Sequence, residues 1–255
     1  MAPRGLKKLL KTTAPAAFVK GKFAGFVQVV NGVRSGNKLR GLTRALESGV
    51  WSKNSTLPSI AKYSAVKRGG WKGPRGGRQR GAAVDAQLSR AVNAGVTKPK
   101  SGQYTLTKLA LAALAEQGLE PVVSQRAVCN DRLRIGTAAD VICFEKSSGK
   151  LVVVELKCNG GQARTAPAEQ RNGQKCRMLS PLGRASDHTL NRHFAQLACT
   201  LALFVREERT LEKLCALGVS ADVGAGLLYV NDELTEFYDL PKWWVDRGDR
   251  ILNNI

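Results

Sequence analysis

Three charged residues, Asp140, Glu155 and Lys157, lie within a short apolar part of the sequence. The segment that contains them, 136–159, has the sequence GTAADVICFEKSSGKLVVVELKCN. Two apolar runs flank the polar stretch EKSSGK, a pattern that predicts a β-hairpin. Side chains alternate along a strand, so Glu155 and Lys157 share one face of the second strand. A buried strand that carries two charges on one face needs a chemical reason for them.

The position of the turn decides what Asp140 faces. If the turn centres on Ser147 and Ser148, Asp140 lies opposite Glu155, and a turn one residue later places it opposite Lys157. Directly opposed Cβ atoms are about 5 Å apart. Two carboxylates at that distance in an apolar sheet repel each other unless positive charge lies between them. Hard divalent cations such as Mg²⁺ prefer such oxygen ligands, so the hairpin predicts a cation site.

The segments around the hairpin predict further elements in a definite order. A helix is expected over 104–118, ended by Gly118, and a strand over 121–129. After a long polar loop, a helix is expected from Ser186 or Asp187 to about residue 208, because these residues are good N-caps. The apolar run 225–230 predicts a last, buried strand.

Asp140, followed after fourteen residues by Glu155-Leu156-Lys157, resembles the motif of the PD-(D/E)XK nuclease superfamily. The family's usual proline is replaced by Ala139, a position that varies in the family. The superfamily core runs helix, three strands, helix, strand, which is the order predicted here. The resemblance therefore implies an α/β fold with a restriction-endonuclease-like core, in which helices flank a mixed central sheet, plus a basic N-terminal extension.

Two more positions are similar to the RecB-like, lambda-exonuclease-like branch of this superfamily. That branch carries a glutamine on the second core helix, and Gln196 matches it, with Thr200 where a tyrosine is usual. An upstream G-x-x-x-H motif helps to hold metal in that branch, and Gly81 matches its glycine, with Asp85 in place of the histidine. Asp85 is therefore a candidate third ligand, and Glu116 on the later helix is the alternative.

The resemblance implies a metal-dependent nuclease that hydrolyses DNA phosphodiester bonds with one or two Mg²⁺ or Mn²⁺ ions. Asp140, Glu155, the backbone carbonyl of Leu156 and Asp85 would hold metal. Lys157 would position or help to deprotonate the attacking water, and Gln196 would hold substrate or the lysine. The branch implies an exonuclease of DNA repair, recombination or replication. The alternatives are an endonuclease of the same fold and a non-catalytic, basic nucleic-acid-binding protein.

The positive charge of the chain is concentrated near its N-terminus. Residues 1–84 hold eighteen Lys and Arg and a single acid, Glu47, and so carry +17 of the net charge of +20. Such a segment binds phosphate backbones without sequence preference. We therefore expect a Gly-rich extension over 1–78 and a nuclease-like domain over 79–255. The candidate nucleic-acid contacts are Lys72, Arg75, Arg78, Arg80, Arg164, Arg171, Lys175 and Arg184.

The basic, acid-free first thirty residues also suit a mitochondrial transit peptide, so nucleus, virion and mitochondrion all remain open as destinations of an intracellular protein. No apolar run has the length of a membrane span. The six cysteines are dispersed without a C-x-x-C pair, and neither a zinc ribbon nor an iron–sulfur cluster is expected.

Overall fold

The computed structural model describes residues 1–19, 25–30, 33–52, 57, 73–158, 164–165, 167–170, 172–231 and 235–255. Within these ranges, residues 17–19, 25, 30, 33–37 and 73–79 are described by their backbone alone.

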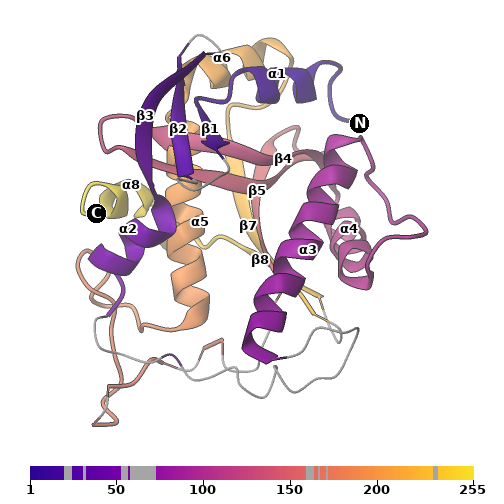
Figure 1. The fold of residues 1–255 in the computed structure, drawn as a ribbon. Helices are drawn as coiled ribbons and strands as arrows, with labels where there is room; N and C mark the ends of the chain where they lie inside the picture. The colour runs from indigo at the N-terminus through magenta and orange to yellow at the C-terminus, as the bar shows by residue number, and fades with distance from the viewer. Residues whose placement is uncertain are drawn as a thin grey trace.

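Helices and strands alternate along the chain (Figure 1). The helices are α1 (Leu6–Thr12), α2 (Leu42–Gly49), α3 (Gly73–Asn93), α4 (Thr105–Glu116), α5 (Thr189–Val205), α6 (Glu208–Ala216), α7 (Lys242–Val245) and α8 (Gly248–Leu252). The strands are β1 (Ala16–Val19), β2 (Gly25–Val30), β3 (Val33–Gly41), β4 (Leu119–Asn130), β5 (Ile135–Glu145), β6 (Leu151–Lys157), β7 (Val223–Val230) and β8 (Thr235–Asp239). None of the helices in these ranges has the length and apolar character needed to cross a membrane.

The strands form one mixed sheet in the order β1-β2-β3-β5-β6-β7-β8, with β4 paired to β5. The pairs β3–β5 and β6–β7 are parallel, and the other pairs are antiparallel. The element order predicted from the sequence is confirmed in α4, β4, β5, β6, α5 and β7. The coarse class, an α/β fold with a mixed sheet between helices, is therefore confirmed.

Each face of the sheet has its own apolar core. Helices α3 and α4 cover one face, where Leu88 and Leu111 pack against Val154 and Leu156 of β6. Helix α5 covers the other face with α1, α2, α6, α7 and α8 (Figure 1), and there Leu197 packs in one cluster with Val153 of β6. Since successive side chains of β6 enter opposite cores, Glu155 and Lys157 are on the α5 face.

The hairpin register is the one that places Asp140 beside Glu155. The β5–β6 ladder pairs Phe144 with Leu151 and ends with Val141 opposite Val154. The turn is therefore centred on Ser147 and Ser148. Beyond Val154, β6 pairs with β7 only, up to Lys157 opposite Tyr229.

Strand β5 changes partners along one edge. Strand β4 pairs with it over its whole length. On its other edge, β6 pairs with Val141 to Phe144, and β3 pairs in parallel with Ile135 and Gly136. Residues between these two ladders have no strand partner on that edge among the described residues, and Asp140 is one of them.

The N-terminal region corrects the expected domain boundary at residue 78. Leu6 and Leu10 of α1, and Leu42 and Leu46 of α2, are fully buried in the core that also contains α5. Strand β3 joins the central sheet. The described part of residues 1–52 therefore belongs to the same folded unit as residues 79–255. The Gly-rich basic stretch also differs from expectation, because Gly73–Asn93 forms one helix, α3.

A buried ion pair fastens β4 to two helices. The Arg126 guanidinium donates to both carboxylate oxygens of Glu207, at 2.9 and 2.6 Å, and to the carbonyl of Leu10 at 2.8 Å. The two side chains are only 1% and 9% exposed. The ring of Phe204 lies 5.0 Å from the guanidinium carbon. This contact holds α1 and the start of α6 to the sheet.

We expect Glu207→Ala to lower the free energy of unfolding by about 3–5 kcal/mol, because it leaves the buried Arg126 cation without a partner. Chemical denaturation measures the change. The matched control is Glu212→Ala, which removes an exposed carboxylate from α6 and should change stability by less than about 0.5 kcal/mol. Equal effects of the two substitutions would contradict a stabilising role of the pair.

Candidate active site

The Asp140 carboxylate takes the place of a backbone carbonyl at the point where the β5–β6 ladder ends. Its Oδ2 accepts a hydrogen bond of 2.9 Å from the backbone N–H of Leu156. Its own carbonyl accepts one of 2.6 Å from the Ser124 hydroxyl of β4. The carboxylate is thereby fixed at the end of the ladder, beside Glu155 of the next strand.

Glu155, Lys157 and Gln196 form a closed triangle of polar contacts. The Lys157 ammonium donates to Glu155 Oε1 at 2.6 Å, and the Gln196 amide donates to the same oxygen at 2.6 Å. Lys157 also donates to Gln196 Oε1 at 3.4 Å. Glu155 is 3% exposed, so α5 covers this carboxylate. The contact with Lys157 corresponds to one of the two roles that the resemblance implies for Gln196, and the contact with Glu155 was not predicted.

Gln125 of β4 connects Asp140 to Asp85 of α3. Its Nε2 donates to Asp140 Oδ1 at 3.2 Å and to Asp85 Oδ1 at 2.9 Å. The backbone of Gln125 has φ 54°, a left-handed conformation that a non-glycine residue rarely adopts within a strand. Such strained backbone tends to occur at functional sites. Gln125 was not predicted as a site residue from the sequence. The three consecutive polar residues 124–126 interrupt an apolar strand and could have indicated it.

The structure distinguishes the two candidate third ligands. Asp85 shares Gln125 with Asp140, and the nearby Glu155 carboxylate contributes to raising the pKa of Asp85. Glu116 is exposed at the last position of α4. Within the described chain, no contact connects Glu116 to Asp140 or Glu155. The geometry therefore favours Asp85.

The acids of the site repel one another in a low-dielectric environment. Burial raises the pKa of Asp140 well above its usual value, and the nearby Glu155 carboxylate raises it further. Burial also raises the pKa of Asp85, against the hydrogen bond from Gln125. Burial alone would lower the pKa of Lys157, but Glu155 and Asp140 outweigh it and the pKa is raised. Three carboxylates thus surround one lysine cation, and the site lacks positive charge.

The chemistry of these residues fits a hard divalent cation. Among the residues that the structure describes, no three His, Cys, Asp or Glu side chains form a ready ligand set. The Gln125 amide lies between Asp85 and Asp140, and the Lys157 ammonium lies on Glu155. Rotation of these two flexible donors would free carboxylate oxygens, which are the ligands that Mg²⁺ and Mn²⁺ prefer.

Two histidines of α5 have structural partners. His188 is the N-cap, and its Nδ1 accepts from the N–H of Asn191 at 3.1 Å, so the helix begins later than Ser186 or Asp187. The Nδ1 of His193 lies 2.7 Å from the Tyr229 hydroxyl. Burial, together with the nearby Lys157 cation, lowers the pKa of His193 well below its usual value.

The predicted nucleic-acid contacts have different environments. The Arg164 side chain is 13% exposed and forms an ion pair with Glu236, and its guanidinium carbon lies 4.2 Å from the centroid of the Tyr229 ring. Because these contacts engage the side chain, phosphate binding is no longer expected of Arg164. Arg80 is half-buried near Cys158 at the end of β6. Lys175 and Arg184 are exposed on the loop before α5. Lys72 and Arg171, and the side chains of Arg75 and Arg78, lie outside the described residues.

No protein-family model matches this chain, and no curated protein matches it at a significant level.

We expect Mg²⁺ or Mn²⁺ to stabilise the protein in the absence of any substrate. A ligand at one hundred times its Kd raises the free energy of unfolding by about 2.7 kcal/mol. Denaturation with and without EDTA measures this gain. Asp140→Asn and Asp85→Asn should lose most of it, whereas the control Glu116→Gln should keep it. A gain that survives Asp140→Asn would contradict the site.

The raised pKa of Asp140 predicts a stability that falls with pH in EDTA. Between the usual value of 3.8 and the higher pKa in the folded protein, the folded state binds more protons than the unfolded state. The free energy of unfolding therefore decreases as pH rises through this window. Asp140→Asn lacks this component, so its stability relative to wild type should increase as pH rises above 3.8 toward the higher pKa in the folded protein. The exposed control Asp222→Asn should remain parallel to wild type, and a parallel Asp140→Asn curve would contradict the assignment.

Proposed function

We propose that this protein is a metal-dependent nuclease that hydrolyses DNA phosphodiester bonds. The observation that supports this most is the single site that combines Asp140, Glu155 and Lys157. Asp140 lies at the end of the β5–β6 ladder, and Glu155 and Lys157 lie together under Gln196. The same residues carry the resemblance to the PD-(D/E)XK superfamily. Buried acids that repel one another are stabilised by a cation, and a bound divalent cation can activate water and stabilise the transition state of phosphodiester hydrolysis.

Each residue of the site has a distinct task in this reaction. Asp140, held by the N–H of Leu156, and Glu155, held by Gln196, provide fixed carboxylates for the metal. Asp85 contributes a third carboxylate once Gln125 turns away. Lys157 lies beside Glu155, where its ammonium can hold the attacking water and stabilise the negative charge that develops on the phosphate. Gln196 holds the Lys157 and Glu155 side chains in place by contacting both.

When bound, Mg²⁺ or Mn²⁺ would activate water, neutralise the scissile phosphate and offset the two carboxylates that raise the pKa of Lys157. A lysine suits this position better than an arginine, because an ammonium group changes its protonation state far more readily. Once it has lost its own proton to solvent, the neutral Lys157 amine could accept one from the attacking water. The carbonyl of Leu156, on the residue between Glu155 and Lys157, is a further candidate ligand.

DNA as the substrate agrees with the charge of the chain. The positive charge is concentrated in residues 1–84, which include α1, α2 and the first part of α3. These elements lie around the same sheet as the site (Figure 1). Phosphate backbones would therefore be attracted to the molecule that carries the catalytic acids. The resemblance to the RecB-like branch favours an exonuclease.

We expect the protein to cleave labelled linear single-stranded or double-stranded DNA with Mg²⁺ or Mn²⁺, and to be inactive in EDTA. Lys157→Ala and Asp140→Asn should each lower the rate at least about 10²-fold, because each removes a group that acts on the reacting phosphate or water. Gel electrophoresis of the products measures cleavage. A covalently closed circle that stays intact would identify an exonuclease, and a cut circle would identify an endonuclease.

The matched controls are Lys146→Ala and Asp222→Asn, which change exposed residues of the same types away from the site. Both should keep wild-type rates. Binding of DNA by all five proteins, measured by fluorescence anisotropy, separates catalysis from affinity. Tight, salt-sensitive binding without cleavage in any metal would overturn the proposed function and leave a non-catalytic nucleic-acid-binding protein.

A further inference from the structure

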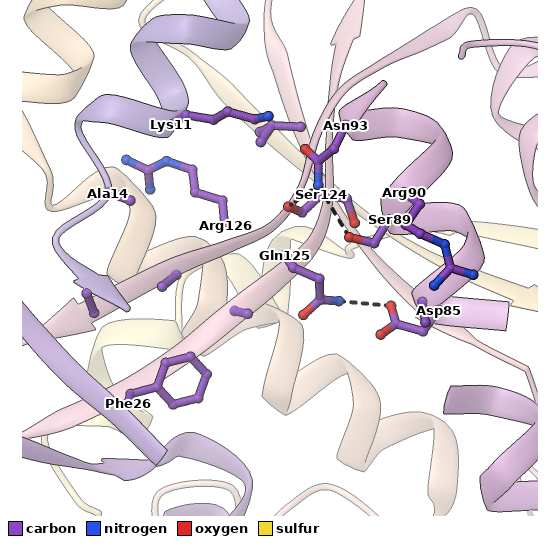
Figure 2. Close-up of a pocket in the computed structure, with 15 residues that line it drawn as sticks. Lys11, Ala14, Phe26, Asp85, Ser89, Arg90, Asn93, Ser124, Gln125 and Arg126 are labelled. Carbon is purple, nitrogen blue, oxygen red and sulfur yellow. Dashed lines mark hydrogen bonds between the residues drawn. The ribbon is translucent and has the colours of Figure 1, made fainter. Parts of the chain in front are cut away.

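A pocket of about 850 Å³ adjoins the candidate site on its β4 side. It lies between α3, the middle of β4, and the segment that contains α1 and the start of β1 (Figure 2). Asp85 and Gln125 belong both to the pocket and to the chain of contacts that leads to Asp140. In Figure 2, Lys11 of α1 lies across the pocket from Asp85. The pocket therefore begins at Asp85 and Gln125, beside the other acids of the site, and extends away from them along β4.

The charge of the pocket changes along its length. Asp85 is its only acid among the fifteen lining residues. Lys11 and Arg90 are exposed side chains that also line it, and neither has a hydrogen bond or ion pair with another described residue. The third cation, Arg126, is already bound to Glu207 and is unavailable. Away from the acids, the pocket thus presents two unpaired cations.

The other lining groups are those expected of a site for an unpaired strand. Ser89, Asn93 and Ser124 supply hydroxyl and amide groups. The half-buried ring of Phe26 forms part of the wall. Proteins that bind single strands combine basic side chains that follow the backbone with aromatic faces that contact bases. Helix α1 is tied to the end of α3 by the Lys7 ammonium, which donates to the Val92 carbonyl at 2.7 Å, and this contact closes one side.

The volume of the pocket, about 850 Å³, lies in the range of small-ligand sites, which is about 300–1,000 Å³. A site of this size suits a short length of one strand rather than a duplex.

We propose that this pocket binds the single polynucleotide strand that adjoins the scissile phosphate, with Lys11 and Arg90 contacting its phosphates. The placement of the strand relative to the cut rests on the proposed function. The N-terminal helix α1, which lies outside the αβββαβ order of the nuclease core, would thereby form one wall of the substrate path. An enzyme built this way acts on DNA whose strands are separated at the site.

The test compares the double variant Lys11→Gln/Arg90→Gln with the control Lys8→Gln/Lys98→Gln. The control removes the same charge from exposed lysines outside the pocket, one of them on α1. Binding of a fluorescent single-stranded oligonucleotide is measured in EDTA over a range of salt concentrations. Each lost phosphate contact reduces the slope of log K against log salt by about 0.7 for single strands. The slope of log K against log salt should therefore be smaller by about 1.4 for the pocket variant than for the control. The two variants should have the same free energy of unfolding in chemical denaturation.

The outcomes separate the pocket from the proposed function. Equal slopes for the two double variants, in a protein that cleaves DNA, would overturn the pocket and leave the nuclease. A smaller slope for the pocket variant, in a protein that cleaves nothing in any metal, would support strand binding and overturn the nuclease. A loss seen with a blunt duplex but not with the single strand would overturn the single-strand assignment. Loss of slope with the single strand, together with cleavage by wild type, supports both.

Discussion

The site depends on a single constraint in the sheet: one edge of β5 serves two partners. Strand β6 pairs with its last part and β3 with its first part, and neither covers the residues between. The Leu156 N–H faces this gap, and the carboxylate of Asp140 satisfies it in place of a strand carbonyl. A buried N–H that lacks a hydrogen-bond partner is destabilising. The Leu156 N–H therefore holds the Asp140 carboxylate in place, and the carboxylate satisfies the N–H. Glu155 lies beside Asp140, because it is the next residue of β6 after Val154, the last residue paired with β5.

The remaining structure keeps together a group of charges that destabilises itself. Asp140, Glu155 and Asp85 repel one another, and the Lys157 cation partly offsets this repulsion. Two apolar cores, one on each face of β6, enclose the strand on which the charges lie. Gln125 and Gln196 each donate to carboxylates of the site and so supply neutral donors where the charge is unbalanced. The left-handed backbone of Gln125 is part of the same arrangement, because it directs the amide toward both acids at once.

Local pattern was sufficient to predict the hairpin and the residues on it. A short turn and strict alternation place the charges of the hairpin on one side but leave two registers open, and the observed pairing decides that Asp140 lies beside Glu155. Gln196 was predicted only from its match to a glutamine in the motif that the sequence resembles. The pairing of β3 with β5 could not be predicted, because it joins residues nearly one hundred positions apart and leaves no periodic signal. The same holds for the Arg126–Glu207 pair and for the contact of His193 with Tyr229, each of which depends on where distant elements pack.

Gly136 shows what the N-terminal strands mean for the solubility of the molecule. A Cβ at this glycine would lie 3.0 Å from Phe26 and 3.1 Å from Leu39, so β2 and β3 pack directly over the start of β5. Strand β3 also pairs with the first two residues of β5 and so covers a short part of its edge that β6 does not reach. Unpaired strand edges can pair with other chains and lead to aggregation. Proteolytic loss of the first fifty residues would uncover this edge and remove the buried leucines of α1 and α2 from the core, so the remaining chain would be both less stable and prone to associate.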